Sequence, residues 1–180
     1  PDSLEAVEPF LYNLFLDPDI IDFPFAKIAR EPLARLISSR RSKKVQHYYA
    51  EIGGKSPIFE LTSLQARALE TELKKSVDAK VFVAMRYWHP LTEEVLNQIK
   101  KEKFDEIILL PLYPQYSKTT RGSSLNEWKR KFPSARLDSV PVKVISDFHN
   151  HHIYIEAVVE RIKEALPRFS DSKTEDVFLL

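Results

Sequence analysis

The feature that most constrains the fold is a continuous aliphatic run at 107–112, Ile-Ile-Leu-Leu-Pro-Leu. Such a run, without alternation, is typical of a strand buried on both faces of a parallel sheet. Further β-branched, strand-like segments lie at 81–87 and 140–145, and a last one at 177–180. Stretches long enough for a helix separate them. Strands that alternate with helices predict an α/β fold, a doubly wound parallel sheet with flanking helices.

The first half of the chain is predicted to be helical. Apolar residues recur with helical spacing from Leu4 to Phe15, and Asp17-Pro18 then ends the helix. An apolar stretch interrupted by proline follows at 20–25. Gly53-Gly54 is a typical helix end. The remaining predicted helices, in chain order, are 26–38, 43–52, 56–75, 91–101, 123–132 and 154–166.

Composition excludes several classes of protein. Lys and Arg number 27 against 26 Asp and Glu, a formal net charge of +1, so the global charge does not favour a nucleic-acid partner. The chain has no cysteine, which excludes disulfides and thiolate-ligated metal sites within it. No apolar run approaches the roughly 18 residues of a transmembrane helix. We expect a cytoplasmic protein, with peripheral membrane contact left open.

Polar and aromatic residues follow each of the first three predicted strands. The three groups are Arg86, Tyr87 and His89; Tyr113, Gln115, Tyr116 and Ser117; and Ser146, Asp147 and His149. Ligands of open α/β sheets bind outside the carboxyl ends of the strands. We therefore expect these loops to converge on one cleft.

The residues of this expected cleft suit a large planar ligand that carries carboxylates. Tyr87, Trp88, Tyr113 and Tyr116 offer flat aromatic surface, and Arg86 offers a two-pronged donor for an anion. A nucleotide fits less well, because the chain has three glycines and no glycine-rich phosphate loop. The segment 119–124 could hold an anion at a helix N-terminus, and a capped helix after a polar turn explains it equally well.

Three histidines, His149, His151 and His152, invite comparison with a metal site. His151 and His152 are adjacent, however, and cannot both face one ion from a regular helix. The spacing matches no established ligand pattern, so the metal ligands stay unknown, and a surface or transit site for iron at these histidines stays open.

Five motifs resemble the ferrochelatase family in order and spacing, and together they span almost the whole chain. They are Ile-Gly-Gly-Lys-Ser-Pro-Ile at 52–58, Arg-Tyr-Trp-His-Pro-Leu-Thr-Glu-Glu at 86–94, Leu-Pro-Leu-Tyr-Pro-Gln-Tyr-Ser at 110–117, Gly-Ser-Ser-Leu-Asn at 122–126 and Phe-His-Asn-His-His-Ile at 148–153. Arg121 differs from the small polar residue that is usual in the family at its position.

The resemblance implies an enzyme, a lyase of haem biosynthesis that inserts ferrous iron into protoporphyrin IX to form protohaem. It implies two similar domains with the porphyrin between them, and no covalently bound cofactor. The family's catalytic His, in a Ser-Ala-His motif after a strand like 177–180, and its partner Glu would follow Leu180. The family's opening strand would precede Pro1. We therefore expect residues 1–180 to be the N-terminal porphyrin-binding domain, a fragment that is inactive without its C-terminal half.

The resemblance also implies which residues touch the porphyrin or its propionates, namely Arg41, Tyr49, Ser56 and Tyr116. The predicted porphyrin-binding set adds the loop residues Arg86, Tyr87, His89 and Ser117. For Arg86 and His89, orienting their loop by hydrogen bonds is the alternative, and for Ser56 it is capping of the helix that follows.

The apolar stretch at 20–25 resembles the family's lip over the porphyrin pocket. Its residues Ile20, Ile21, Phe23 and Phe25 could contact a membrane, or could form an ordinary buried loop.

Two other functions stay open at this point. One is a non-catalytic porphyrin-binding module. The other is a chelatase for another tetrapyrrole, such as coproporphyrin, because one fold can serve several chemistries. A Ser-Ala-His sequence after Leu180 would favour the ferrochelatase.

Overall fold

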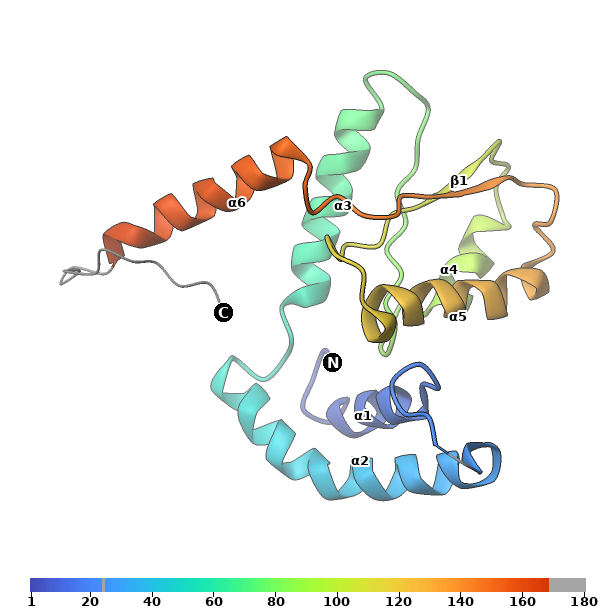
Figure 1. Ribbon diagram of the computed structural model, residues 1–180, viewed down its shortest axis with the longest axis vertical. Coiled ribbons are helices and arrows are strands. Elements are labelled where there is room, and N and C mark those ends of the chain that lie inside the picture. The colour runs from blue at the N-terminus through green and yellow to red at the C-terminus, as the bar shows by residue number, and fades with distance from the viewer. Residues whose placement is uncertain (24, 169–180) are drawn as a thin grey trace.

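The computed structural model describes residues 1–23 and 25–168, and it arranges helices around a small parallel sheet (Figure 1). Its helices are α1 (Val7–Leu16), α2 (Ala26–Glu51), α3 (Ile58–Leu73), α4 (Thr92–Ile99), α5 (Ser123–Lys131) and α6 (His152–Ala165). Its strands are β1 (Ile107–Leu109) and β2 (Val142–Val144). Three short helical turns complete it: η1 (Lys118–Gly122), η2 (Phe132–Ala135) and η3 (Leu166–Arg168).

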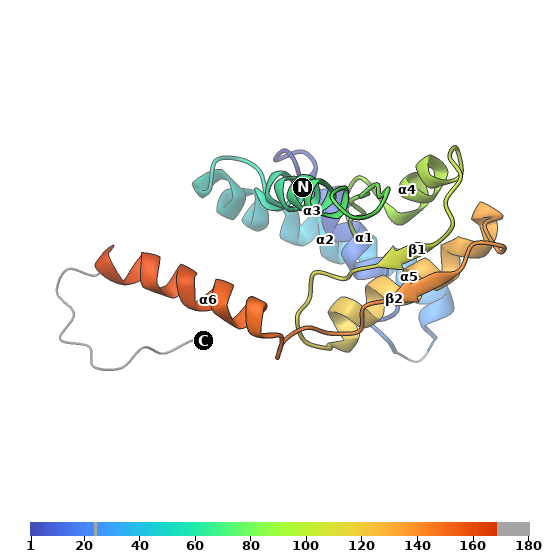
Figure 2. The same cartoon turned by 90° about the horizontal axis from the view of Figure 1, so that it is seen from above.

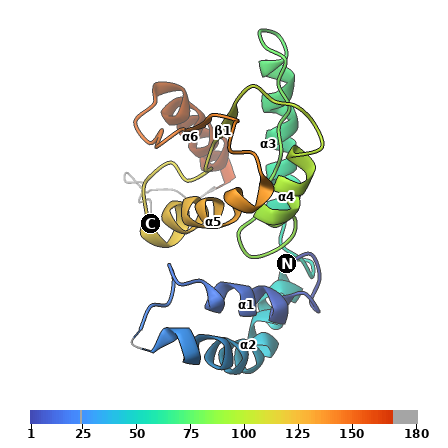
Figure 3. The ribbon, with the colours of Figure 1, turned by 90° about the vertical axis from the view of Figure 1, so that its right-hand side faces the viewer.

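Helices α1 and α2 form a layer of their own, seen at the bottom of Figures 1 and 3. The apolar residues Val7, Leu11 and Phe15 follow one another at intervals of four, so they lie on one side of α1. They are buried against Ala34 of α2 and form the first core of the molecule. This amphipathic pattern confirms the predicted first helix.

α2 is one continuous helix of 26 residues where the sequence predicted two. The prediction of a break between 38 and 43 is wrong because the serines there are satisfied inside the helix. The Ser38 hydroxyl donates to the Arg35 carbonyl (3.0 Å), and the Ser42 hydroxyl donates to the Ser39 carbonyl (2.9 Å). Both serines are buried, and neither competes for backbone groups outside the helix.

The glycine pair ends α2 as predicted. Gly53 and Gly54 have φ angles of 95° and 82°, in the left-handed region that other residues avoid. The amide of Gly54 donates to the carbonyl of Tyr49 (2.8 Å), which satisfies one of the last carbonyls of the helix.

The sheet consists of β1 and β2, which pair in parallel with Ile107 opposite Val142 and Leu109 opposite Val144. Ile107 is buried with Val95 and Ile99 of α4 and forms the second core. These elements confirm the α/β class and the parallel pairing. Each strand is shorter than its predicted run.

The predicted strand at 81–87 is wrong for the residues described. Its chain is extended but makes only an isolated bridge between Met85 and Leu91. A strand needs the backbone groups of a neighbour, and the described part of the chain places no second strand along it. The predicted strand at 177–180 lies outside the described residues.

Helices α3 and α6 are the least packed elements. Neither has a completely buried side chain, and α6 extends away from the sheet (Figure 2). Within the described ranges, no helix is long and apolar enough to cross a membrane.

Replacing Gly54 by alanine should destabilise the protein. The added Cβ meets no neighbour, so the cost is the positive φ angle alone, about 1–2 kcal/mol. Gly122→Ala is the matched control, because its backbone is helical and its new Cβ would make ordinary contacts. That variant should gain up to about 1 kcal/mol. Urea unfolding midpoints of the complete protein measure the stability changes of both variants. Equal changes would contradict the cost assigned to the positive φ angle of Gly54.

Candidate functional site

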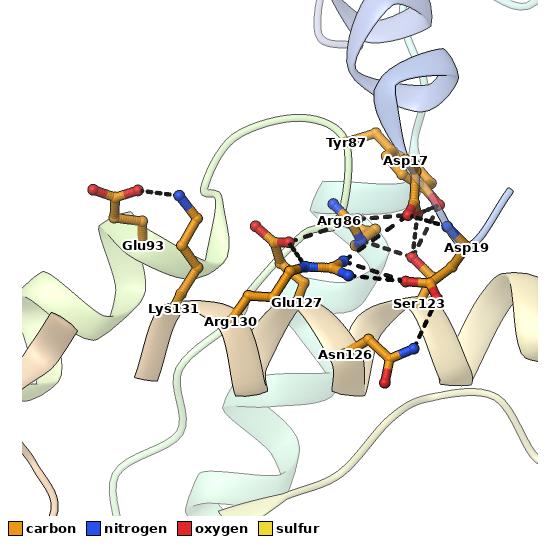
Figure 4. Close-up of polar contacts among 10 residues, drawn as sticks. All are labelled: Asp17, Asp19, Arg86, Tyr87, Glu93, Ser123, Asn126, Glu127, Arg130 and Lys131. Carbon is orange, nitrogen blue, oxygen red and sulfur yellow. Dashed lines mark hydrogen bonds and ion pairs between the residues drawn. The ribbon is translucent and has the colours of Figure 1, made fainter. Parts of the chain in front are cut away.

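A buried carboxylate lies at the junction of the two layers. The side chain of Asp17, just after α1, is fully buried. It accepts hydrogen bonds from the Tyr87 hydroxyl (2.7 Å), the Ser123 hydroxyl and the Asp19 amide (2.9 Å) (Figure 4). It also pairs with the Arg86 guanidinium at 3.0 Å. Asp17 thus joins the end of α1, the turn that begins at Arg86 and the start of α5.

Arg86 is held by acceptors within the protein. Its Nε donates to the Ser123 hydroxyl (2.7 Å), and a terminal nitrogen lies 3.0 Å from Asp17 and 3.7 Å from Glu127. Only 14% of its side chain is exposed. The positive charge of Arg86 is therefore matched inside the chain, before any ligand is considered.

A second set of contacts reinforces the junction. Asp19 accepts a hydrogen bond from Asn126 (2.8 Å) and two from Arg130 (3.3 Å). Arg130 in turn donates to Glu127 (3.0 Å). The loop after α1 is thereby fastened along α5 (Figure 4). We call the residues Asp17, Asp19, Arg86, Tyr87, Ser123, Asn126, Glu127 and Arg130 the Asp17 cluster.

The surroundings of Asp17 and Tyr87 set the protonation states of their side chains. Burial raises the pKa of Asp17, but hydrogen bonds from Ser123, Tyr87 and the Asp19 amide, together with the charge of Arg86, outweigh it. The net pKa of Asp17 therefore lies below its usual value. Burial raises the pKa of Tyr87. At neutral pH the carboxylate is ionised and the phenol keeps the proton that it donates.

The turn after Arg86 is oriented by its own hydrogen bonds. Nδ1 of His89 lies 2.8 Å from Glu94, which also accepts from the Leu91 amide (2.6 Å) at the start of α4. The bond from Leu91, followed by that from His89, lowers the pKa of Glu94. In the structure, His89 contacts the helix start that it precedes.

The loop after β1 carries the exposed aromatic surface. Tyr116 is 67% exposed. The next residue, Ser117, hydrogen-bonds Thr119 through its hydroxyl (3.1 Å) and accepts from the Gly122 amide through its carbonyl (2.9 Å). The loop after β2 lies alongside, since the Phe148 amide donates to the Pro114 carbonyl (3.2 Å). Two of the three predicted loops are therefore in direct contact.

The remaining predicted residues lie on or near α2. Arg41 is exposed, with its guanidinium carbon 5.7 Å from the centre of the Phe15 ring. Tyr49 is half-buried against the first core, and burial raises its pKa. The Ser56 hydroxyl accepts from the Ile58 amide (3.3 Å) at the start of α3. Within the described residues, no hydrogen bond joins these three to the loops that follow the strands.

The histidines after β2 form no metal centre in the described part of the chain. His149 lies 3.5 Å from Asp147, and the rings of His151 and His152 stack with their centres 4.8 Å apart. Across residues 1–23 and 25–168, no three His, Cys, Asp or Glu side chains are arranged to hold an ion.

Sequence reasoning missed the centre of the site. It took Asp17 as a helix terminator, gave no role to Asp19, and placed Ser123 only in the 119–124 segment and the 122–126 motif. The available signal was a pair of acids around a proline, directly before an apolar stretch. In the structure both acids are paired with cations, Asp17 with Arg86 and Asp19 with Arg130.

Asp17→Asn should destabilise the complete protein by about 3–5 kcal/mol, because it leaves the buried Arg86 with only the more distant Glu127, at 3.7 Å, as a charge partner. Glu93→Gln is the matched control. Glu93 pairs with Lys131 at 2.8 Å on the surface, where removing a charge costs less than about 1 kcal/mol. Urea unfolding gives both values. Similar losses in the two variants would contradict the role of Asp17.

The loss caused by Asp17→Asn should depend on pH. A lowered pKa stabilises the folded state fully above the ordinary value of 3.8, and this contribution is lost as the pH falls through the folded-state pKa. The difference between wild type and variant should be largest above about pH 5 and shrink below it. A constant difference across that range would contradict the ionised state of Asp17.

Comparison with known proteins places the chain in a family. The ferrochelatase family model matches residues 1–180. The chain is 51% identical to the ferrochelatase of Aquifex aeolicus over 93% of its own length and 52% of that protein. It is 51% identical to the ferrochelatase of Geotalea daltonii over 95% of its length and 52% of the relative.

A third relative, the chloroplastic ferrochelatase-2 of Cucumis sativus, is 42% identical over 99% of the chain and 35% of its own length. The chain spans about half the length of the bacterial relatives that it matches. With a match that runs from its first residue to its last, the chain is a member of the ferrochelatase family.

Proposed function

We propose that the complete protein inserts ferrous iron into protoporphyrin IX to form protohaem, and that residues 1–180 supply its porphyrin-binding half. The family match over the whole chain supports this proposal. The groups that remove the pyrrole protons belong, in this proposal, to residues outside the chain, as general bases. The substrates are the porphyrin and Fe²⁺, and no covalently bound cofactor is needed.

The structural observation that carries the proposal is the exposed aromatic surface beyond β1. Tyr116 is 67% exposed and Tyr113 is 38% exposed, both just after the carboxyl end of a parallel strand. That end of the sheet is where α/β folds bind ligands. A flat macrocycle can stack on such rings, while their hydroxyl groups reach polar atoms at its rim.

Arg41 is the proposed partner of a porphyrin propionate. It is exposed on α2, and within the described residues no carboxylate lies within ion-pair distance of it. Arg86 differs, because its charge is matched by Asp17 and Glu127. We therefore propose that two groups of residues act differently. The proposed direct contacts are Arg41, Tyr49, Ser56, Tyr116 and Ser117, and the proposed positioning residues are Arg86, Tyr87 and His89.

A fluorescence titration of the complete protein with protoporphyrin IX tests the contacts. Arg41→Ala should raise the dissociation constant about tenfold, the equivalent of one charge-assisted hydrogen bond of about 1.4 kcal/mol. Adding Tyr116→Phe should weaken binding further if the hydroxyl contacts the ligand. The control is Arg67→Ala, which removes an exposed arginine from α3. An equal effect of Arg41→Ala and Arg67→Ala would contradict the proposal.

Haem formation tests the reaction itself. With Fe²⁺ and protoporphyrin IX under anaerobic conditions, the complete protein should give the absorbance of haem. Residues 1–180 alone should give none. Haem formation by the 180-residue chain would refute the division of labour proposed above.

We also propose a cytoplasmic location with peripheral membrane contact near the start of α2. The residues expected there, Ile20, Ile21, Phe23 and Phe25, are not equally exposed. Ile21 packs against the first core, whereas Phe25 is 85% exposed. Ile28, on the first turn of α2, is 83% exposed. Two large apolar side chains open to solvent at the first turn of α2 suit insertion between lipid headgroups.

Replacing both Phe25 and Ile28 by serine should release the complete protein from lipid vesicles. Flotation with vesicles of phosphatidylcholine and phosphatidylglycerol measures the bound fraction. Ile153→Ser is the matched control, because Ile153 is an isoleucine of α6 that is 60% exposed. If the double variant floats as well as wild type, the contact lies elsewhere or does not exist.

A further inference from the structure

An arginine lies over the exposed tyrosine of the proposed porphyrin wall. The guanidinium carbon of Arg121, in η1, is 5.5 Å from the centre of the Tyr116 ring. The tyrosine folds back along this turn, since its hydroxyl would lie 3.5 Å from a Cβ built on Gly122. Arg121 and Tyr116 therefore form one cation–π unit at the end of the loop that follows β1.

The hydrogen-bonding needs of Arg121 are not met by the described residues. Its Nε is buried, and no acceptor in the described part of the chain lies within hydrogen-bond distance of it. No described carboxylate forms an ion pair with it, and the sequence from Ile107 to Asn126 contains no acid. Arg130, by contrast, pairs with both Asp19 and Glu127. A buried N–H without an acceptor costs about 1–3 kcal/mol, so the described residues leave the guanidinium of Arg121 without full stabilisation.

We propose that Arg121 binds a carboxylate of the porphyrin that stacks at Tyr116, and that it selects for ligands that carry this charge. The inference rests on the proposed function, because it names a contact in the same site. A guanidinium stacked on an aromatic ring keeps its in-plane N–H groups free for a carboxylate. The anion-binding capacity of this segment thus resides in a side chain and not in a helix N-terminus. Arg121 and Arg41 would together provide two separate cations for the propionates.

Two forms of one porphyrin separate this charge effect from simple packing. Protoporphyrin IX carries two carboxylates, and its dimethyl ester has the same ring with both charges removed. In fluorescence titrations of the complete protein, Arg121→Ala should raise the dissociation constant of the acid about tenfold. It should change that of the ester less than about twofold. Lys118→Ala, which removes another cation from the same turn, should leave both constants unchanged.

The outcomes distinguish this inference from the function on which it rests. Weaker binding of the acid alone supports a carboxylate contact. Equal weakening of acid and ester would mean that Arg121 only packs on Tyr116, and no effect on either would remove it from the site; both overturn the inference. Failure of the wild-type protein to bind protoporphyrin would instead overturn the proposed function. If Arg121→Ala does not fold, Arg121→Lys and Arg121→Gln replace it, and only the neutral glutamine should lose affinity for the acid.

Discussion

The buried carboxylate of Asp17 is the interaction on which the arrangement of the two layers depends. The α1–α2 pair has its own apolar core, and so does the group formed by the sheet with α4 and α5. The two cores share no residue. A buried charge cannot be left without partners, because its desolvation costs several kcal/mol. The partners of Asp17 all belong to the other layer, apart from the neighbouring Asp19 amide, so the charge fixes how the layers meet.

The same interaction separates the two arginines of the predicted porphyrin-binding set. Arg86 and Arg41 are both cations near the proposed cleft. The structure gives Arg86 two internal carboxylates and leaves Arg41 exposed. An arginine whose charge is already matched gains little from a ligand carboxylate, whereas an unmatched one gains a full charge-assisted bond. The distinction depends on Asp17 and cannot be seen in either arginine's own segment.

Hydrophobic runs and helical spacing predicted those elements whose structure depends mainly on their own residues. The aliphatic run at 107–112 and the β-branched run at 140–145 predicted parallel strands, and the spacing from Leu4 to Phe15 predicted α1. The strand at 81–87 and the break in α2 were wrong, because one depends on a neighbouring strand and the other on how serines bond inside a helix. The partners of Asp17 lie 70 and 106 residues further along the chain. No local periodicity encodes contacts at such separations.

The continuity of α2 fixes the spacing of the side chains that it carries. With a rise of 1.5 Å per residue, Arg41 and Tyr49 are held about 12 Å apart along the helix axis. Because the helix runs without a break through Arg41 and Tyr49 to Glu51, changing that spacing would require breaking the backbone hydrogen bonds of its last turns. If both residues contact the porphyrin as proposed, this side of the site cannot adjust to a ligand of different size. Any such adjustment would fall to the loops that follow the strands, where Tyr116 lies just before η1.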